Sequence, residues 1–132
     1  MIVDSSAIVA VLNGEPERGA FLSILAEAKG SAKMSAATYV EIGIVIDSGK
    51  DPTTSRRVDE LLSEFEIGLV EVTSEHALIA RSAYRDFGRG SGHPARLNFG
   101  DTFVFALATV TGEPVLCKGD DFAQTNLAIV KH

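Results

Sequence analysis

Short apolar runs alternate with helical stripes along the chain. Runs of two to five residues predict strands, and apolar residues three and four positions apart predict helices. The predicted strands span residues 2–3, 33–35, 68–72, 115–117 and 127–130. The predicted helices span residues 5–12, 15–29, 36–48, 53–66, 74–88 and 99–110, with a turn into a short helix at 119–122. This alternation predicts a three-layer α/β/α sandwich with a short, mostly parallel central sheet.

The helix at residues 36–48 carries an acid on an apolar stripe. Spacing places five side chains on one face, which we expect to point into the core: Ala37, Val40, Glu41, Ile44 and Val45. A buried carboxylate loses hydration that is worth roughly several kcal/mol unless a cation or hydrogen-bond donors replace the water. No Lys or Arg lies one turn away on the stripe, so a metal ion or a cationic side chain from elsewhere is the expected partner of Glu41.

Other acids follow strands or begin helices. Asp4 follows the first strand and Asp120 follows the strand at 115–117, and the carboxyl ends of parallel strands lie at one edge of a sheet. Asp101 lies near the start of the most apolar helix. We therefore expect Asp4, Glu41, Asp101 and Asp120 to converge, and Mg²⁺ or Mn²⁺ would offset their mutual repulsion.

Each of these acids except Glu41 also has an ordinary structural interpretation. Asp4 is suited to cap the helix that follows it, and this is the more common role when Asp4 is considered alone. Asp101 is suited to a helix N-terminus. Asp120 and its neighbour Asp121 are typical turn residues. The joint pattern is thus more informative than any single acid.

Size and composition indicate one globular domain that spans residues 1–132. The chain has a mass of 14.0 kDa, 45% hydrophobic residues and a mean hydropathy of +0.16, which exclude disorder, and its apolar runs are too short to span a membrane. Met1 leads directly into a strand without a charged leader, which predicts a cytoplasmic location. Cys117 and three scattered His residues show no zinc-ligand spacing.

The formal charge of −6 at first argues against a nucleic-acid partner. If four of the 18 acids bind cations, 14 acids remain against 12 bases, a balance of −2. Arg81, Arg85 and Arg89 follow four-residue steps, and His93 and Arg96 lie in the loop beyond. A solvated helix face is the favoured interpretation of this basic run taken alone.

Four sequence blocks resemble those of the PIN-domain ribonucleases, and more specifically the VapC toxins of bacterial type II toxin–antitoxin pairs. They are MIVDSSA at 1–7, MSAATYVE at 34–41, LNFGDTF at 97–103 and LCKGDDF at 116–122. By this resemblance Asp4, Glu41 and Asp101 match the family's metal-binding acids. The fourth acid is Asp120 or Asp121, because the usual family ending separates its two acids by one residue and here they are adjacent. Counting from the strand favours Asp120.

The resemblance also implies an activity and partners. It implies Mg²⁺-dependent hydrolysis of RNA, inhibition by a VapB-like antitoxin whose basic tail covers the acids, and self-association into a homodimer. Ser6 and Thr102 match positions where the family often has hydroxyl or amide groups near the metal. The cations that could attract the RNA backbone are Arg89, Arg96 and Lys118.

Three other functions compete with this one. A phosphatase of the haloacid dehalogenase type needs a second Asp two residues after the first, where this chain has Ser6. A receiver domain of a signalling pair expects an acidic pair near the first strand, whereas Asp4 stands alone. A PIN-like binding module without turnover stays open, although the presence of all the expected acids makes an active enzyme the favoured interpretation.

Overall fold

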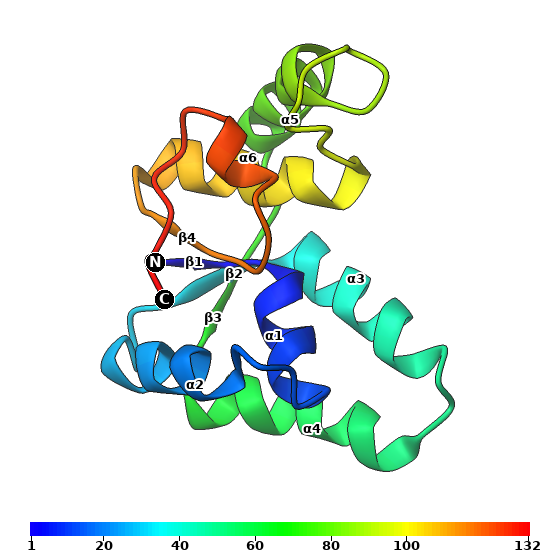
Figure 1. The fold of residues 1–132 in the computed structure, drawn as a ribbon, viewed down its shortest axis with the longest axis vertical. Helices are drawn as coiled ribbons and strands as arrows, with labels where there is room; N and C mark the ends of the chain where they lie inside the picture. Colours follow the sequence, from blue (N-terminus) through cyan, green and yellow to red (C-terminus); the bar gives the residue numbers. More distant parts are fainter.

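The structure is a computed structural model that describes residues 1–132. A four-stranded parallel sheet in the order β3-β2-β1-β4 forms its centre (Figure 1). The strands are β1 (Ile2–Val3), β2 (Lys33–Ser35), β3 (Gly68–Val70) and β4 (Val115–Leu116). In the register, Ile2 lies opposite Lys33 of β2 and Val115 of β4. All strands therefore end at one edge of the sheet.

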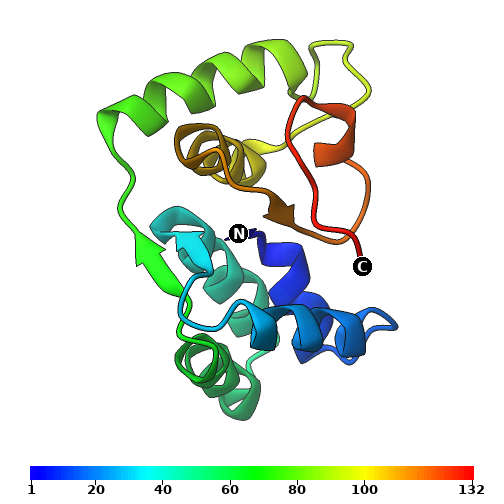
Figure 2. The ribbon, with the colours of Figure 1, turned by 90° about the vertical axis from the view of Figure 1, so that its left-hand side faces the viewer.

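Helices cover both faces of this sheet. One side holds α1 (Ser5–Leu12), α2 (Arg18–Glu27), α3 (Ala36–Asp47) and α4 (Pro52–Glu64). The other side holds α5 (Ser74–Phe87), α6 (Phe99–Thr111) and the 3₁₀ turn η1 (Phe122–Gln124). Figures 1 and 2 show these two helical layers with the sheet between them, which confirms the predicted three-layer α/β/α architecture. None of the helices combines the length and the apolar character needed to cross a membrane.

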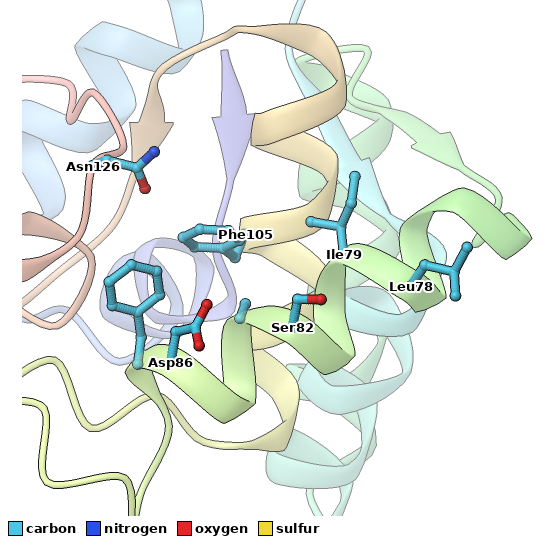
Figure 3. A pocket seen from close by; sticks show the side chains of 8 residues that line it. Leu78, Ile79, Ser82, Asp86, Phe105 and Asn126 are labelled. Atoms are coloured by element: carbon cyan, nitrogen blue, oxygen red, sulfur yellow. The ribbon is translucent and has the colours of Figure 1, made fainter.

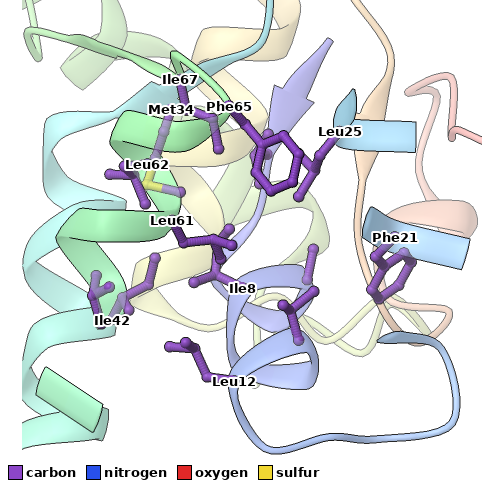
Figure 4. Packing of buried hydrophobic residues seen from close by; sticks show 14 of the residues in the cluster. Ile8, Leu12, Phe21, Leu25, Met34, Ile42, Leu61, Leu62, Phe65 and Ile67 are labelled. Atoms are coloured by element: carbon purple, nitrogen blue, oxygen red, sulfur yellow. The ribbon is translucent and has the colours of Figure 1, made fainter. Parts of the chain in front are cut away.

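Two apolar clusters form the core, one on each face of the sheet. The larger has 18 buried residues from α1 to α4 and the strands, including Phe21 and Leu25, and Figure 4 shows its packing. The smaller has 11 buried residues and lies under α5 and α6. Neighbouring strand residues enter opposite clusters, because successive side chains of a strand point to opposite faces: Val3 joins the larger and Ile2 the smaller.

The predicted strand at residues 127–130 is the main difference in secondary structure. Only an isolated parallel bridge joins Ile129 to Val115, and two backbone hydrogen bonds connect the segments. On this edge of β4 the pairing stops at Val115, whereas on the other edge both Val115 and Leu116 pair with β1. The C-terminal segment therefore crosses the sheet edge as irregular chain.

The predicted inward stripe of α3 is wrong. The helix buries Thr38, Ile42 and Ile46 instead. Val40, Ile44 and Val45 are 58%, 68% and 50% exposed. The physical reason is that α3 is apolar on most of its circumference, so its periodicity does not select one face, and packing against α1 and α4 decides the rotation. Ala37 and Glu41 consequently lie half-buried at the border of the buried face.

Candidate active site

Asp4 joins the end of β1 to the start of α1. It caps α1, because its Oδ2 accepts hydrogen bonds from the backbone N–H of Ser6 at 3.0 Å and from the Ser6 hydroxyl at 2.5 Å. The residue is only 4% exposed, and its Oδ1 is buried without a hydrogen-bond partner. Burial raises the pKa of Asp4, the hydrogen bonds from Ser6 lower it in part, and repulsion by Glu41 raises it further. One carboxylate oxygen is thus left available for a ligand.

Ser6 connects Asp4 to the segment that follows β4. Its hydroxyl donates to Asp4 and accepts a hydrogen bond from the backbone N–H of Lys118 at 2.9 Å. Asp120 and Asp121 lie two and three residues beyond Lys118. Ser6 therefore contacts Asp4 and also holds the start of the loop that carries Asp120 and Asp121.

Asp101 lies in the first turn of α6. Asn98 and Asp101 form a capping box in which the Asn98 backbone N–H donates to Asp101 Oδ2 at 2.9 Å and the Asp101 N–H donates to Asn98 Oδ1 at 2.8 Å. Burial raises the pKa of Asp101 to about 7, against the lowering effect of the Asn98 hydrogen bond. The charges of Asp4, Asp121 and Glu41 raise this pKa further. Asp101 thus shares an electrostatic environment with the other acids.

Glu41 of α3 lies directly against the backbone of Gly100 in α6. A Cβ atom added to Gly100 would lie 1.6 Å from Glu41 Oε2 and 2.5 Å from its Cδ. Only a residue without a side chain leaves room for the carboxylate beside Asp101. Sequence reasoning missed Gly100. The available signal was a glycine in the first turn of an apolar helix, where most other residues stabilise a helix better.

The two candidates for the fourth acid differ in their coupling to the site. Both Asp120 and Asp121 are exposed. The charge of Asp121 is among the principal causes of the raised pKa of Asp101, and that of Asp120 is not. After burial, the surrounding acids also raise the pKa of the Cys117 thiol to about 12, and Asp121 contributes more than Asp120. The electrostatics thus favour Asp121, whereas counting from the strand favours Asp120.

The donor chemistry of this site suits a hard divalent cation. The acids supply only oxygen atoms, which Mg²⁺ and Mn²⁺ prefer, and the partnerless Oδ1 of Asp4 is an available ligand atom. No group of three or more His, Cys, Asp or Glu side chains is placed so that it could already hold a metal ion. The residues therefore fit the cation in type and in charge, and binding requires the carboxylates to draw closer.

The remaining predicted residues have other contacts. The Thr102 hydroxyl donates to the carbonyl oxygen of Phe99 at 2.6 Å, within α6, rather than to an acid. The Lys118 ammonium pairs with Glu15 at 2.9 Å and Glu17 at 3.4 Å. Arg89 and Arg96 are exposed and form no ion pair, so both are available to a polyanion.

An apolar cleft opens beside Glu41. It has a volume of about 440 Å³, and its lining combines the exposed side of α3 with the start of α6: Ala37, Val40, Glu41, Ile44, Val45, Phe99, Gly100 and Phe103. A second pocket, of about 360 Å³, lies between α5, Phe105 of α6 and Asn126 (Figure 3). None of the site acids lines that second pocket. Glu41 is the one site acid that lines the first cleft.

Comparison with known proteins assigns the chain to a family. Residues 1–127 match the PIN domain family. Over 96% of the chain, the sequence is 52% identical to the protein named Ribonuclease VapC28 of Mycobacterium tuberculosis, 95% of which is covered. This chain belongs to the VapC ribonucleases of the PIN domain family. It is also 49% identical, over 96% of each chain, to Ribonuclease VapC42 of the same species.

Solved structures show that this VapC-family protein has the same fold as known toxins. The crystal structure of Mycobacterium tuberculosis VapC20, described as a sarcin-ricin loop cleaving toxin, matches with a TM-score of 0.79 at 16% identity over 99% of this chain and 98% of that one. VapBC2 from Rickettsia felis, bound to a promoter DNA fragment, matches with a TM-score of 0.77 at 10% identity over 98% and 96%. At these identities the likeness concerns the fold alone.

Proposed function

We propose that this VapC-family protein is the toxin of a toxin–antitoxin pair and hydrolyses RNA phosphodiester bonds with Mg²⁺ or Mn²⁺. The observation that carries this proposal is the buried Asp4 carboxylate, which has one oxygen without a partner and lies within electrostatic range of Glu41 and Asp101. Family membership and the names of the curated relatives support the reaction. Asp4, Glu41, Asp101 and either Asp120 or Asp121 are the proposed metal ligands.

In this proposal the acids bind and orient the cation. The contacts around Asp4, Asp101 and Glu41 position their carboxylates. When bound, the cation would supply Lewis-acid activation of the phosphodiester and lower the pKa of its water. Ser6 holds the Asp4 carboxylate through Oδ2, and the partnerless Oδ1 is the atom that would bind the cation. The capping box fixes Asp101 in the same way through Oδ2. Glu41 reaches the site only because Gly100 leaves space for it.

Asp4→Asn tests the proposal while preserving the fold. Asn caps helices as well as Asp does, so α1 keeps its N-cap. The variant loses the negative charge, and an NH₂ group replaces the oxygen that is proposed to bind the cation. Asp51→Asn is the matched control, because Asp51 caps α4 in the same manner, accepting from the Thr53 N–H at 3.0 Å, and is exposed. We expect Asp4→Asn to abolish Mg²⁺-dependent cleavage of structured RNA and Asp51→Asn to leave it unchanged. Equal cleavage by Asp4→Asn and wild type would remove Asp4 from the mechanism.

Metal binding is measured separately by thermal unfolding with Mn²⁺. A cation at 100 times its Kd stabilises the folded protein by about 2.7 kcal/mol. We expect this gain for wild type and for Asp51→Asn, and a much smaller gain for Asp4→Asn. Wild type that gains stability with Mn²⁺ and binds RNA without cutting it would instead be a binding module without turnover.

The proposed protein partner is a small antitoxin with a basic tail. Toxin–antitoxin complexes are among the solved structures with this fold, including one from Klebsiella pneumoniae with a TM-score of 0.72 at 14% identity. The excess of acid at the site suits a cationic peptide, since Arg pairs strongly with carboxylates. A short reading frame next to the gene, with a DNA-binding head and a basic tail, is the expected source. Co-expression of its product should restore growth that this protein alone arrests.

We also propose that the protein forms a homodimer. Sedimentation equilibrium of the purified chain should then report twice the chain mass of 14.0 kDa. A monomer at micromolar concentration would contradict this expectation.

A further inference from the structure

Phe99 is the most exposed large hydrophobic residue of the chain. It begins α6, two residues before Asp101, and is 76% exposed. Val40 and Ile44 of α3 lie in the same cleft and are also exposed. Contiguous exposed apolar surface of this kind marks a binding site more often than a scattered single residue does. The feature therefore needs a ligand that has an apolar face.

The Phe99 ring is held by its surroundings. It packs edge-to-face with Phe103, at 5.1 Å between ring centroids and an interplanar angle of 88°. The backbone beneath it is fixed by the Asn98 cap and by the Thr102 hydroxyl, which donates to the Phe99 carbonyl. With most of its surface in solvent, the ring keeps a face open for stacking. A ring that is already ordered loses little entropy when a ligand stacks on it.

The cleft connects this ring to Glu41. Phe99 and Glu41 line the same volume of about 440 Å³, and Gly100 lies between Phe99 and Asp101 along the chain. A flat group that stacks on Phe99 thus lies in the same cleft as the Glu41 carboxylate. In an RNA, the group next to a scissile phosphate is one of the two flanking bases, and unpaired bases stack on aromatic side chains.

We propose that Phe99 is the stacking platform for an unpaired nucleobase adjacent to the scissile phosphate. This inference rests on the proposed ribonuclease function and adds a substrate requirement, namely that a nucleotide at the cut is not base-paired. An apolar peptide segment is the other chemistry that the cleft accommodates. An RNA base is favoured because the open aromatic face shares its cleft with Glu41, one of the proposed metal ligands.

The test compares variants on one RNA oligonucleotide that the wild type cuts. Phe99→Leu keeps an apolar side chain and removes the ring, and Phe99→Trp keeps a ring. Ile44→Ala removes apolar surface from the same cleft, and Leu78→Ala does so at an exposed position of α5 outside it. We expect Phe99→Leu to lower kcat/KM about 10- to 100-fold, in line with base–aromatic stacking. Phe99→Trp and the control Leu78→Ala should stay within about three-fold of wild type. Ile44→Ala removes apolar surface from the cleft and keeps the ring, so its loss should be smaller than that of Phe99→Leu.

A second substrate identifies the base. Two versions of this substrate are used, one with an abasic nucleotide on the 5′ side of the cut and one with it on the 3′ side. If Phe99 stacks on that base, the abasic substrate should lower kcat/KM of the wild type by the same factor as Phe99→Leu does on the intact substrate. For Phe99→Leu, the abasic substrate should lower kcat/KM little further. If the factor lost through Phe99→Leu and the factor lost through the missing base multiply, Phe99 does not contact that base. Multiplication at both flanking positions overturns the proposal.

Three further outcomes separate the possibilities. If wild type cuts RNA and Phe99→Leu cuts equally well, the stacking proposal is wrong while the proposed function stands. If wild type cuts no RNA, the proposed function fails and the inference fails with it. If Phe99→Leu and Ile44→Ala both cut normally but bind the antitoxin or a second copy of the chain more weakly, the cleft is a protein-docking surface instead.

Discussion

Replacing Gly100 by Ala should remove activity with little effect on stability. The added Cβ would lie 1.6 Å from Glu41 Oε2, and ordinary contact begins at 3.4 Å. The Glu41 carboxylate must therefore move by about 1.8 Å. Displacements of about 1 Å at a catalytic group cost on the order of 10²-fold in rate, so we expect a loss of at least this size in kcat/KM for RNA cleavage.

The expected stability change is small because the obstacle is the end of a flexible side chain. Ala in place of Gly stabilises a helix by up to about 1 kcal/mol, and a shifted Glu41 rotamer costs about 0.5–1.5 kcal/mol. The two effects nearly cancel. Urea unfolding should therefore place Gly100→Ala within about 1 kcal/mol of wild type.

A matched control and a second background make this prediction sharper. Gly43 lies in α3, two residues from Glu41, and its nearest neighbour to an added Cβ is Asp47 Oδ2 at 3.9 Å. Gly43→Ala should keep full activity and stabilise the protein by up to about 1 kcal/mol. In a Glu41→Ala background, Gly100→Ala should also be stabilising, since the three atoms nearest to the added Cβ all belong to Glu41. Full activity of Gly100→Ala would refute the claim that cleavage depends on where the Glu41 carboxylate lies. Destabilisation beyond about 2 kcal/mol would refute the claim that the Glu41 side chain moves aside at little cost in stability.

Three further predictions concern charge and packing. The pKa of Asp101 is about 7 in the folded protein against an ordinary 3.8, so the folded state binds the proton more tightly and stability falls as pH rises from about 4 to about 7. In EDTA, urea unfolding should show Asp101→Asn to be more stable than wild type at pH 8 and not at pH 5. RNA cleavage should fall further for Asp121→Asn than for Asp120→Asn, and the reverse order would restore the choice made by counting from the strand. Ile42→Ala should cost about 2–5 kcal/mol and Ile44→Ala less than about 0.5 kcal/mol, because only Ile42 is buried.

The elements and their order were predictable because strands and helices here differ in length and in period. The rotation of α3 was not. Its sequence is apolar at Val40, Ile44 and Val45 and also at Ile42 and Ile46, so two faces compete and local pattern is uninformative. Tertiary contacts with α1 and α4, which the local pattern does not encode, select the face with Ile42 and Ile46. The loss of the last predicted strand has a similar origin, since its pairing with β4 is a tertiary contact that reaches only Val115.

The site was predictable where topology alone fixes a residue. Asp4 ends β1 and Asp101 begins α6, so both positions follow from element boundaries. Glu41 was singled out for a reason that the structure corrects: it borders the buried face of α3 and faces Gly100, rather than lying within an apolar core. The choice between Asp120 and Asp121 depends on the path of an exposed loop, which spacing does not determine.

Asp4 and Asp101 each serve a helix terminus with one oxygen, and this explains how a fold tolerates acids that repel one another. Oδ2 of each residue accepts a backbone N–H and stabilises a helix start. That contribution partly offsets the burial and repulsion that raise both pKa values. The capping interpretation and the metal-site interpretation of these residues are therefore compatible. Because Asn supplies the same capping oxygen without the charge, Asn variants separate the two roles, whereas Ala variants would remove both at once.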